Sequence, residues 1–306
     1  MDAPAISICV CTFQRPALLA RLLAALAVQA GAPRFEVVVV DNDAAGSAKA
    51  VLTAAARDPR LALRSAVEPR QSIALARNRS VRLARAEWLA FIDDDEEPAA
   101  GWLAGLHRAA RAFGADAVAG PVVPRLPPAT PAWFVRAGVY DRPRHATGAR
   151  VPPGELRTGN LLIRRDVLLR GAPADGPFDP RFGLSGGEDS KLLRGLARRG
   201  ARFVWCDEAE VVETIPAART RVGYLVATAF GAGHIYARQE LALRGRRAMP
   251  GFVIRGLGAL VVGSAMALAS LPRGPDHAVR WARLAVTGAG KLLGLAGGRY
   301  DRYARR

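Results

Sequence analysis

The chain has 306 residues, half of them hydrophobic, with only three cysteines, which leaves ample material for a core and excludes a disulfide-built scaffold. The formal net charge of +17 favours anionic partners: nucleic acid, anionic lipid or phosphorylated substrates. The start, MDAPAISICV, has no basic segment followed by a long apolar stretch, so we expect no secretory signal and a cytosolic location.

The first 120 residues alternate between strand and helix patterns. Short apolar runs predict strands over residues 6–12, 35–40, 61–67, 88–92 and 115–119. Helical spacing of apolar residues predicts helices over residues 16–29, 44–57, 73–86 and 98–113. This alternation predicts an α/β fold with a mostly parallel sheet and helices on both sides.

From residue 121 the alternation is interrupted. Residues 121–153 are rich in Pro, Arg and Gly and are expected to form a long loop. A strand over 158–163, a helix over 189–199 and a strand over 202–206 are predicted to follow.

The C-terminal part of the chain is strongly basic and partly apolar. Residues 217–306 carry 15 Arg and Lys against three acidic residues. Within them, residues 256–271 hold no charge, and 284–298 form a second apolar stretch. The first stretch is shorter than the ~20 residues that span a bilayer. We expect an interfacial or docked helix at an anionic membrane surface; a true span, and an extension packed on the body or on a second copy, are the alternatives.

The strongest local signal is a run of five acids, Asp93 to Glu97, directly after the fourth predicted strand. In open α/β sheets, ligands bind outside the carboxyl ends of the strands. Neighbouring carboxylates repel one another unless a cation joins them, and Mg²⁺ or Mn²⁺ suits such oxygen ligands. The residues leave two ligand pairs open, Asp93 with Asp95 or Asp94 with Asp95. Glu96 and Glu97 are explained as the start of the next helix.

A second acidic pair, Glu188 and Asp189, opens a predicted helix after two glycines. A carboxylate here could take the proton from an attacking hydroxyl. A helix cap explains the same residues equally well, so the pair indicates a catalytic site only in combination with the other acidic motifs.

Polar residues also follow the first two predicted strands. Thr12 and Phe13 offer a polar contact and an aromatic face, and Asp41 could accept from a base or a ribose, with a strand-end turn as the alternative. Arg77 and Asn78 lie on the helix before the Asp run. Arg suits bidentate phosphate contact, and an exposed surface Arg is the alternative reading.

Taken in order, five segments resemble glycosyltransferase family 2. They are SICVCTFQRP at 7–16, VVVVDND at 37–43, ARN at 76–78, FIDDD at 91–95 and GED at 187–189. The likeness covers about residues 5–235 and is greatest to bacterial exopolysaccharide enzymes of the succinoglycan glucosyltransferase type. Each segment alone is unspecific, whereas the ordered set is specific.

The resemblance implies a GT-A fold and inverting transfer of a sugar from a nucleotide-diphosphate donor, a UDP-hexose such as UDP-glucose. It implies a catalytic domain at 1–235, with a nucleotide-sugar-binding half at 1–120 and an acceptor half at 121–235. A basic extension at 236–306 would associate with the membrane. The acceptor would be a saccharide or a lipid-linked molecule in cell-surface polysaccharide synthesis, at the inner face of the cell membrane.

By the same resemblance, Asp189 would be the catalytic base, with Glu188 beside it. Asp93 and Asp95 would bind the divalent metal, Mn²⁺ or Mg²⁺. Asn42 stands where the family often has a second acid. The nucleotide sugar would be bound by Thr12, Phe13, Arg15, Asp41, Asp43, Arg77, Asn78, Asp93 and Asp94.

Two other functional classes fit the sequence less well. A nucleotidyltransferase of related fold would carry a Gly-rich, Lys-bearing phosphate loop near the N-terminus, where this chain reads TFQRP. A non-catalytic basic protein that binds membrane or nucleic acid would leave the strand-end acids unexplained. The low aromatic content, 7%, further disfavours nucleic acid as a partner.

Overall fold

The computed structural model describes residues 3–245, 247 and 249–296. Within them the chain divides into two compact units. The first unit holds the residues up to Pro124 together with Arg142–Leu184 and Glu188–Thr214. The second holds Arg125–Asp141, Ser185–Gly187 and the residues from Ile215 onward.

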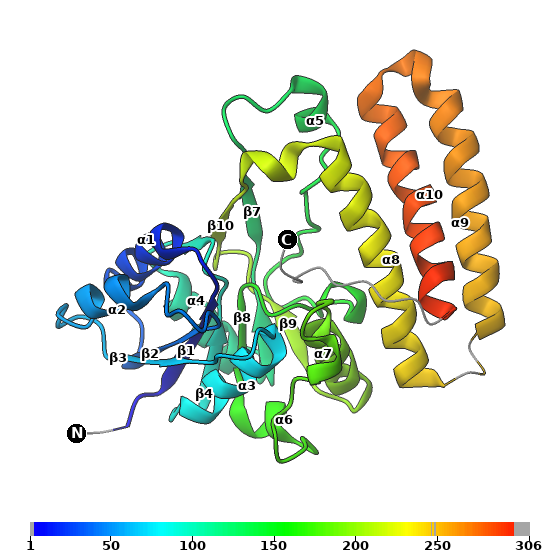
Figure 1. Ribbon diagram of the computed structural model, residues 1–306. Coiled ribbons are helices and arrows are strands. Elements are labelled where there is room, and N and C mark those ends of the chain that lie inside the picture. The colour runs from blue at the N-terminus through cyan, green and yellow to red at the C-terminus, as the bar shows by residue number, and fades with distance from the viewer. Residues whose placement is uncertain (1–2, 246, 248, 297–306) are drawn as a thin grey trace. The chain divides into compact units, whose positions relative to one another are not determined.

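The first unit is built on a seven-stranded sheet in the order β3-β2-β1-β4-β8-β6-β9 (Figure 1). Neighbouring strands run parallel, except that β8 is antiparallel to both β4 and β6. The mostly parallel sheet predicted from the sequence is thereby confirmed. The strands are β1 (Ile6–Thr12), β2 (Phe35–Asp41), β3 (Leu63–Val67), β4 (Trp88–Phe91), β6 (Ala117–Ala119), β8 (Leu161–Arg164) and β9 (Phe203–Trp205).

Helices of the first unit pack against the main sheet through two hydrophobic clusters. One cluster joins apolar residues of α1 and α4 to Ile6, Ile8 and Val10 of β1, and the other joins residues of α3, α6 and α7 to Cys9 of the same strand. Because successive side chains of a strand point to opposite faces, β1 contributes to a core on each side of the sheet. The helices are α1 (Pro16–Ala27), α2 (Lys49–Ala55), α3 (Ile73–Leu83), α4 (Trp102–Ala112), α6 (Arg165–Leu169) and α7 (Glu188–Arg198).

The helix predicted over residues 98–113 is wrong at its start. Glu96–Pro98 forms a short strand, β5, and the helix α4 begins only at Trp102. β5 pairs antiparallel with β10 (Val211–Thr214). This partner lies far along the chain, and local periodicity does not reveal a pairing of that kind. Glu96 and Glu97 therefore belong to a strand and do not open a helix.

The loop predicted over residues 121–153 is also corrected. It contains a strand, β7 (Val122–Arg125), and a short helix, α5 (Ala132–Arg136). Strand β7 joins β10 and β5 in a second, three-stranded sheet. Pro124 lies within β7, a position that is compatible only with an edge strand, and β7 is at the edge of this sheet.

Three long helices form most of the second unit: α8 (Val222–Arg244), α9 (Met249–Ser270) and α10 (Pro275–Leu295). Helix α10 packs against both α8 and α9, and Figure 1 shows α9 and α10 side by side. Glycines allow this close packing. A Cβ on Gly263 would lie 2.5 Å from the Ala285 nitrogen, and one on Gly290 would lie 2.0 Å from the Phe230 oxygen. The sequence predicted apolar helical segments here but no element over α8.

Helix α9 presents large apolar side chains to solvent. Ile254, Val261 and Leu268 are 71%, 65% and 68% exposed. The segment Met249–Arg273 is long and apolar enough to cross a membrane by length and composition, and 17% of its most apolar window is buried. Exposed apolar faces are typical of interaction surfaces.

Candidate active site

The motifs that follow β1 and β4 meet at one edge of the main sheet. Strands β1 and β4 are parallel neighbours, so the residues that follow them lie at the same edge. The Thr12 hydroxyl donates to Asp94 Oδ2 at 2.8 Å. One guanidinium nitrogen of Arg15, Nη1, lies 3.0 Å from Asp94 Oδ1 and 3.0 Å from Asp95 Oδ2. The structure therefore joins four of the predicted site residues.

A tight turn after β1 places Arg15 in this cluster. Gln14 has a φ of +54°, which is uncommon for a residue with a side chain, and its N–H donates to Ser47 Oγ at 3.2 Å. Pro16 then begins α1, where its fixed φ suits the first helical turn. Backbone strain of this kind is characteristic of functional turns.

The Asp94 carboxyl is buried among other charges. Burial raises its pKa to about 6, the Arg15 cation opposes the rise, and the neighbouring Asp95 carboxylate adds to it. An additional cation at this point would stabilise the charged form. The environment therefore favours binding of positive charge.

No three His, Cys, Asp or Glu side chains form a metal-binding group among the described residues. Two carboxylates do converge, because Asp94 and Asp95 contact the same nitrogen of Arg15. Mg²⁺ is commonly held by one or two carboxylates together with substrate phosphates. These residues therefore fit a divalent ion that shares its coordination with a diphosphate. Of the two ligand pairs left open by the sequence, this geometry favours Asp94 with Asp95.

The buried guanidinium of Arg77 joins the Asp run to the start of α7. Its Nη2 lies 3.2 Å from Asp93 Oδ1, and its Nη1 donates to Glu188 Oε1. The Asp93 side chain is 48% exposed, whereas Glu188 is almost fully buried. Arg77 thus connects two acidic motifs that are far apart in the sequence.

Glu188 is held in an unusual state for a carboxylic acid. Burial raises its pKa to about 7, although the Arg77 cation opposes the rise. Its second oxygen, Oε2, is buried and has no hydrogen-bond partner within the described residues. A carboxyl in this state lies close to its titration point at neutral pH.

Asp189 differs from its neighbour in both exposure and charge state. It is partly exposed, and its Oδ2 accepts from the Thr158 N–H at 3.2 Å and from the Thr158 hydroxyl at 3.3 Å. Burial acts to raise its pKa, but the Arg77 charge, the N–H groups of Ser190 and Thr158, and the Arg157 charge outweigh it, so the pKa is lowered. Asp189 is therefore an ionised, oriented carboxylate.

Several other predicted site residues are engaged in local structure. Both Asp41 oxygens accept backbone N–H groups, from Asp43 at 3.0 Å and from Ala48 at 2.8 Å, and Asp43 in turn accepts from the Ala45 N–H. The Asn78 amide donates to the Phe178 carbonyl and accepts from the Phe178 N–H. Phe13 is partly exposed after β1. Direct donor contacts by these four residues stay a prediction.

Thr158 and Gly159 contact acidic residues, which was not predicted from the sequence, and the strand predicted over 158–163 begins only at Leu161. Thr158 orients Asp189, and a Cβ on Gly159 would lie 2.8 Å from Glu96 Oε1 and 3.6 Å from Asp93 Oδ2. Asn160 has a φ of +57° and its Oδ1 accepts from the Trp102 indole N–H. The only local signal was a Thr-Gly-Asn triplet before an apolar strand, which has no specific meaning on its own.

Comparison with known sequences identifies the family. The sequence model of the family described as glycosyl transferase family 2 matches residues 7–168 of the chain. The succinoglycan biosynthesis protein ExoM of Rhizobium meliloti (strain 1021) is 36% identical over 239 residues, which are 76% of this chain and 74% of the relative.

Solved structures share the fold. A mannosyltransferase from Pyrobaculum calidifontis, in complex with GDP-Man and Mn²⁺, superposes with a TM-score of 0.62 at 21% identity, covering 98% of this chain and 89% of that chain. The S. aureus TarS 1–349 structure with UDP has a TM-score of 0.54 at 16% identity, covering 97% and 93%. The chain is a glycosyltransferase with a GT-A fold and belongs to glycosyltransferase family 2.

Proposed function

We propose that the chain transfers a hexose, with inversion, from a nucleotide-diphosphate donor to a saccharide or lipid-linked acceptor in cell-surface polysaccharide biosynthesis. UDP-hexoses, with UDP-glucose first, are the proposed donors. The 36% identity to a succinoglycan biosynthesis protein supports the pathway class. Structures of the same fold bind UDP-GlcNAc or GDP-Man, which supports a nucleotide sugar as the donor.

The acidic and basic groups of the site have different roles in the proposed reaction. Asp189, ionised and partly exposed, accepts the proton of the acceptor hydroxyl. The hydroxyl oxygen forms a bond to the anomeric carbon as the bond from that carbon to the diphosphate oxygen breaks. The electron pair leaves with the nucleoside diphosphate. Attack from the face opposite the leaving group inverts the anomeric carbon.

Positive charge is needed where the diphosphate departs. A divalent ion, Mn²⁺ or Mg²⁺, held by Asp95 with Asp94 or Asp93, would neutralise charge on the leaving group. Arg15 lies at the same carboxylates and supplies a fixed cation. Thr12, by donating to Asp94, keeps that carboxylate in one orientation.

Membrane association is proposed for the C-terminal part of the chain, residues 236–306, and the catalytic domain for residues 1–235. The exposed apolar side chains of α9 and the basic residues around it support contact with the inner face of the cell membrane. We place the enzyme in the cytoplasm at that surface.

The observation that carries the proposal is the convergence of the β1 end, the β4 end and the α7 start through Thr12, Arg15 and Arg77. The first test is a screen of nucleotide sugars with acceptor saccharides, with and without Mn²⁺, in which released nucleotide is measured. Metal-dependent release from at least one donor is expected. No release from any donor–acceptor combination would contradict the proposal.

Asp189→Asn tests the assignment of the base. Loss of the proton acceptor should lower turnover by about 10²–10⁴-fold, while calorimetry still detects donor and Mn²⁺ binding. Asp166→Asn, which removes an exposed carboxylate paired with Arg164, is the matched control and should leave turnover unchanged. Normal turnover in the Asp189 variant would remove this residue from the mechanism.

A further inference from the structure

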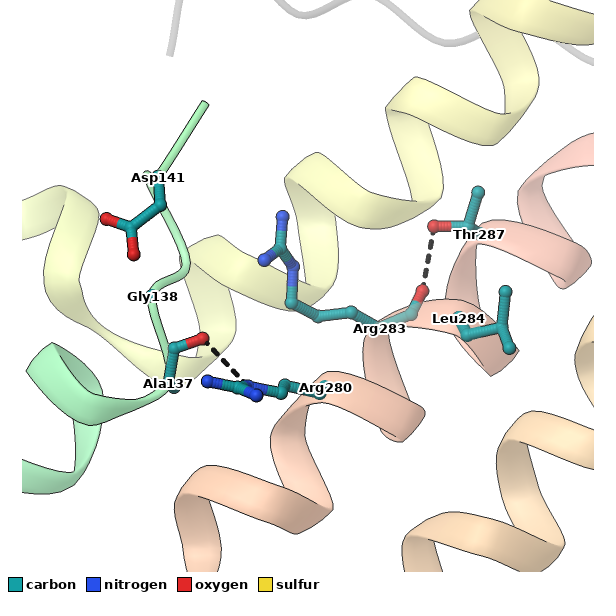
Figure 2. Close-up of a pocket in the computed structure, with 7 residues that line it drawn as sticks. All are labelled: Ala137, Gly138, Asp141, Arg280, Arg283, Leu284 and Thr287. Atoms are coloured by element: carbon teal, nitrogen blue, oxygen red, sulfur yellow. Dashed lines mark hydrogen bonds between the residues drawn. The ribbon is translucent and has the colours of Figure 1, made fainter. Parts of the chain in front are cut away.

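A hollow in the second unit lies outside the catalytic machinery. It measures about 400 Å³ and lies between α10 and the turn that follows α5. Figure 2 shows Arg280 and Arg283 reaching from α10 toward this turn. The lining residues are Ala137, Gly138, Asp141, Arg280, Arg283, Leu284 and Thr287.

Both guanidinium groups are held in place by backbone carbonyls. Arg280 donates through Nε to the Ala137 oxygen at 3.1 Å and through Nη2 to the Arg136 oxygen at 2.9 Å. Arg283 donates through Nη1 to the Val139 oxygen at 3.2 Å. A guanidinium carries five N–H donors, so each group keeps donors for a ligand. The two cations are therefore pre-oriented at the hollow.

Neither guanidinium forms an ion pair within the described residues, although the carboxylate of Asp141 lines the same hollow. No Asp or Glu oxygen of those residues lies within 4.0 Å of either guanidinium, and Asp276 pairs instead with Arg136 at 3.6 Å. Burial lowers the pKa of Arg283, and only the nearby Tyr140 opposes this. Arg283 is partly buried and Arg280 is exposed, and cations that form no ion pair favour binding of an anion.

The surroundings of the two cations are amphipathic. Leu284, on the rim, is 37% exposed, and the neighbouring helix α9 presents its apolar side chains to solvent. Asp141, on the opposite wall, can accept a hydrogen bond from a hydroxyl group. A ligand that fits this set carries a phosphate, an adjacent hydroxyl and an apolar tail.

We propose that Arg280 and Arg283 bind the phosphate of a lipid-borne phosphate ester. This inference rests on the proposed membrane association. It deepens that proposal, because it assigns the binding of lipid phosphate to two named residues and not to the overall positive charge. Guanidinium groups bind phosphate oxygens through paired, charge-assisted hydrogen bonds. The phosphate can belong to a membrane glycerophospholipid or to the diphosphate of a lipid-linked acceptor.

The test compares two double variants, each of which loses two positive charges. Arg280→Gln with Arg283→Gln removes the site, and Arg255→Gln with Arg273→Gln removes two exposed cations of the same unit that do not line it. Full-length protein is bound to phosphatidylglycerol vesicles, and separately to phosphatidylcholine vesicles containing a polyprenyl diphosphate. Binding to phosphatidylcholine alone, whose choline offsets the phosphate charge, is the baseline.

The site variant should bind about tenfold more weakly than the control variant to one of these vesicle types. A difference on phosphatidylglycerol identifies a membrane lipid, and a difference on the diphosphate vesicles identifies the acceptor. Equal losses in both variants, or no loss in either, would overturn the site. Failure of the unsubstituted protein to bind any vesicle would instead overturn the proposed membrane association.

A second variant guards against misfolding, because both arginines also hold backbone carbonyls. Thr287→Glu places a carboxylate in the hollow and leaves all three arginine–carbonyl bonds possible. It should abolish the preference for phosphate-bearing vesicles, with an unchanged melting temperature and unchanged donor hydrolysis. Retained preference in this variant would contradict the proposal.

Discussion

At the residue scale, Arg77 has a structural role that could not be predicted from its position on a helix. It is buried between Asp93 and Glu188, so it holds the Asp run and the α7 start in one arrangement. Its burial would lower its pKa, but the two acids outweigh this and raise it. Arg77 therefore stays charged, and Glu188 depends on that charge.

Replacing Arg77 tests this dependence. Arg77→Met removes the shared partner of Asp93 and Glu188 and should lower the free energy of unfolding by about 3–5 kcal/mol, because both acids lose their counter-charge and Glu188 must take up a proton to stay buried. Urea denaturation measures the loss. Arg164→Met removes an exposed partner of Asp166 and should cost only about 0–1 kcal/mol. Similar losses in the two variants would contradict the structural role of Arg77.

The pKa of Asp94 predicts how the proposed metal binding depends on pH. A carboxyl with a pKa of about 6 is charged above that pH and neutral below it. Only the charged form binds a cation well, so Mn²⁺ affinity should fall about tenfold for each pH unit below 6. Calorimetric titrations above and below pH 6 measure this.

Two variants separate Asp94 from other carboxyls in that experiment. Asp94→Asn should weaken Mn²⁺ binding and remove its pH dependence near pH 6. The Arg60 hydrogen bonds hold the pKa of the partly exposed Asp58 at about 2, so Asp58→Asn should leave the binding curve unchanged. A pH dependence that persists in the Asp94 variant would assign the titration to another group.

At the element scale, the sequence predicted the strands of the main sheet better than it predicted the site. Strands such as Ile6–Thr12 and Phe35–Asp41 are mostly apolar runs that end in a polar residue, and such runs are visible locally. The pairing of β5 with β10 and the contact between Arg77 and Glu188 join distant segments, for which local periodicity carries no signal. Thr158 was missed for the same reason, because its importance comes only from its contact with Asp189.

The packing of α8, α9 and α10 depends on glycine at the contact points. Gly290→Ala should destabilise the second unit by about 1–3 kcal/mol, because the added Cβ would lie 2.0 Å from the Phe230 oxygen. Alanine favours helix over glycine by about 1 kcal/mol, so propensity alone predicts the opposite sign. Thermal unfolding followed by circular dichroism measures the change.

Gly258 provides the matched control on α9. A Cβ there meets no atom within 4 Å, so Gly258→Ala should stabilise the protein by about 0.5–1 kcal/mol. If the two glycine substitutions change stability in opposite directions, the close backbone contact at Gly290 is the cause of the destabilisation. A stabilising effect of Gly290→Ala would mean that the helices do not pack as closely as described.

At the scale of the whole molecule, charge and apolar surface are distributed unevenly between the units. The first unit carries the acidic motifs Asp93–Glu97 and Glu188–Asp189, whereas residues 217–306 have 15 basic against three acidic residues. The apolar residues of α9 that face solvent lie in the second unit. This distribution supports the proposal that the chain binds its donor through the first unit and a membrane through the second.

The stripe formed by Ile254, Val261 and Leu268 tests this arrangement. These residues are spaced seven apart on α9, so they share one face of the helix. Burying each such side chain contributes about 1.5–3 kcal/mol, so changing all three to Ser should weaken vesicle binding by at least about a hundredfold. Flotation with anionic vesicles measures binding. Donor hydrolysis should be retained, because the substitutions lie outside the first unit.

The control changes three exposed apolar residues of the first unit, Val28, Val67 and Leu169, to Ser. This variant removes apolar surface without touching α9 and should bind vesicles normally. Equal loss in both triple variants would show that the effect is not specific to the stripe. If α9 instead packs on a second copy, the α9 variant would change the sedimentation coefficient and leave vesicle binding intact, because the stripe would then stabilise a dimer and not a membrane contact.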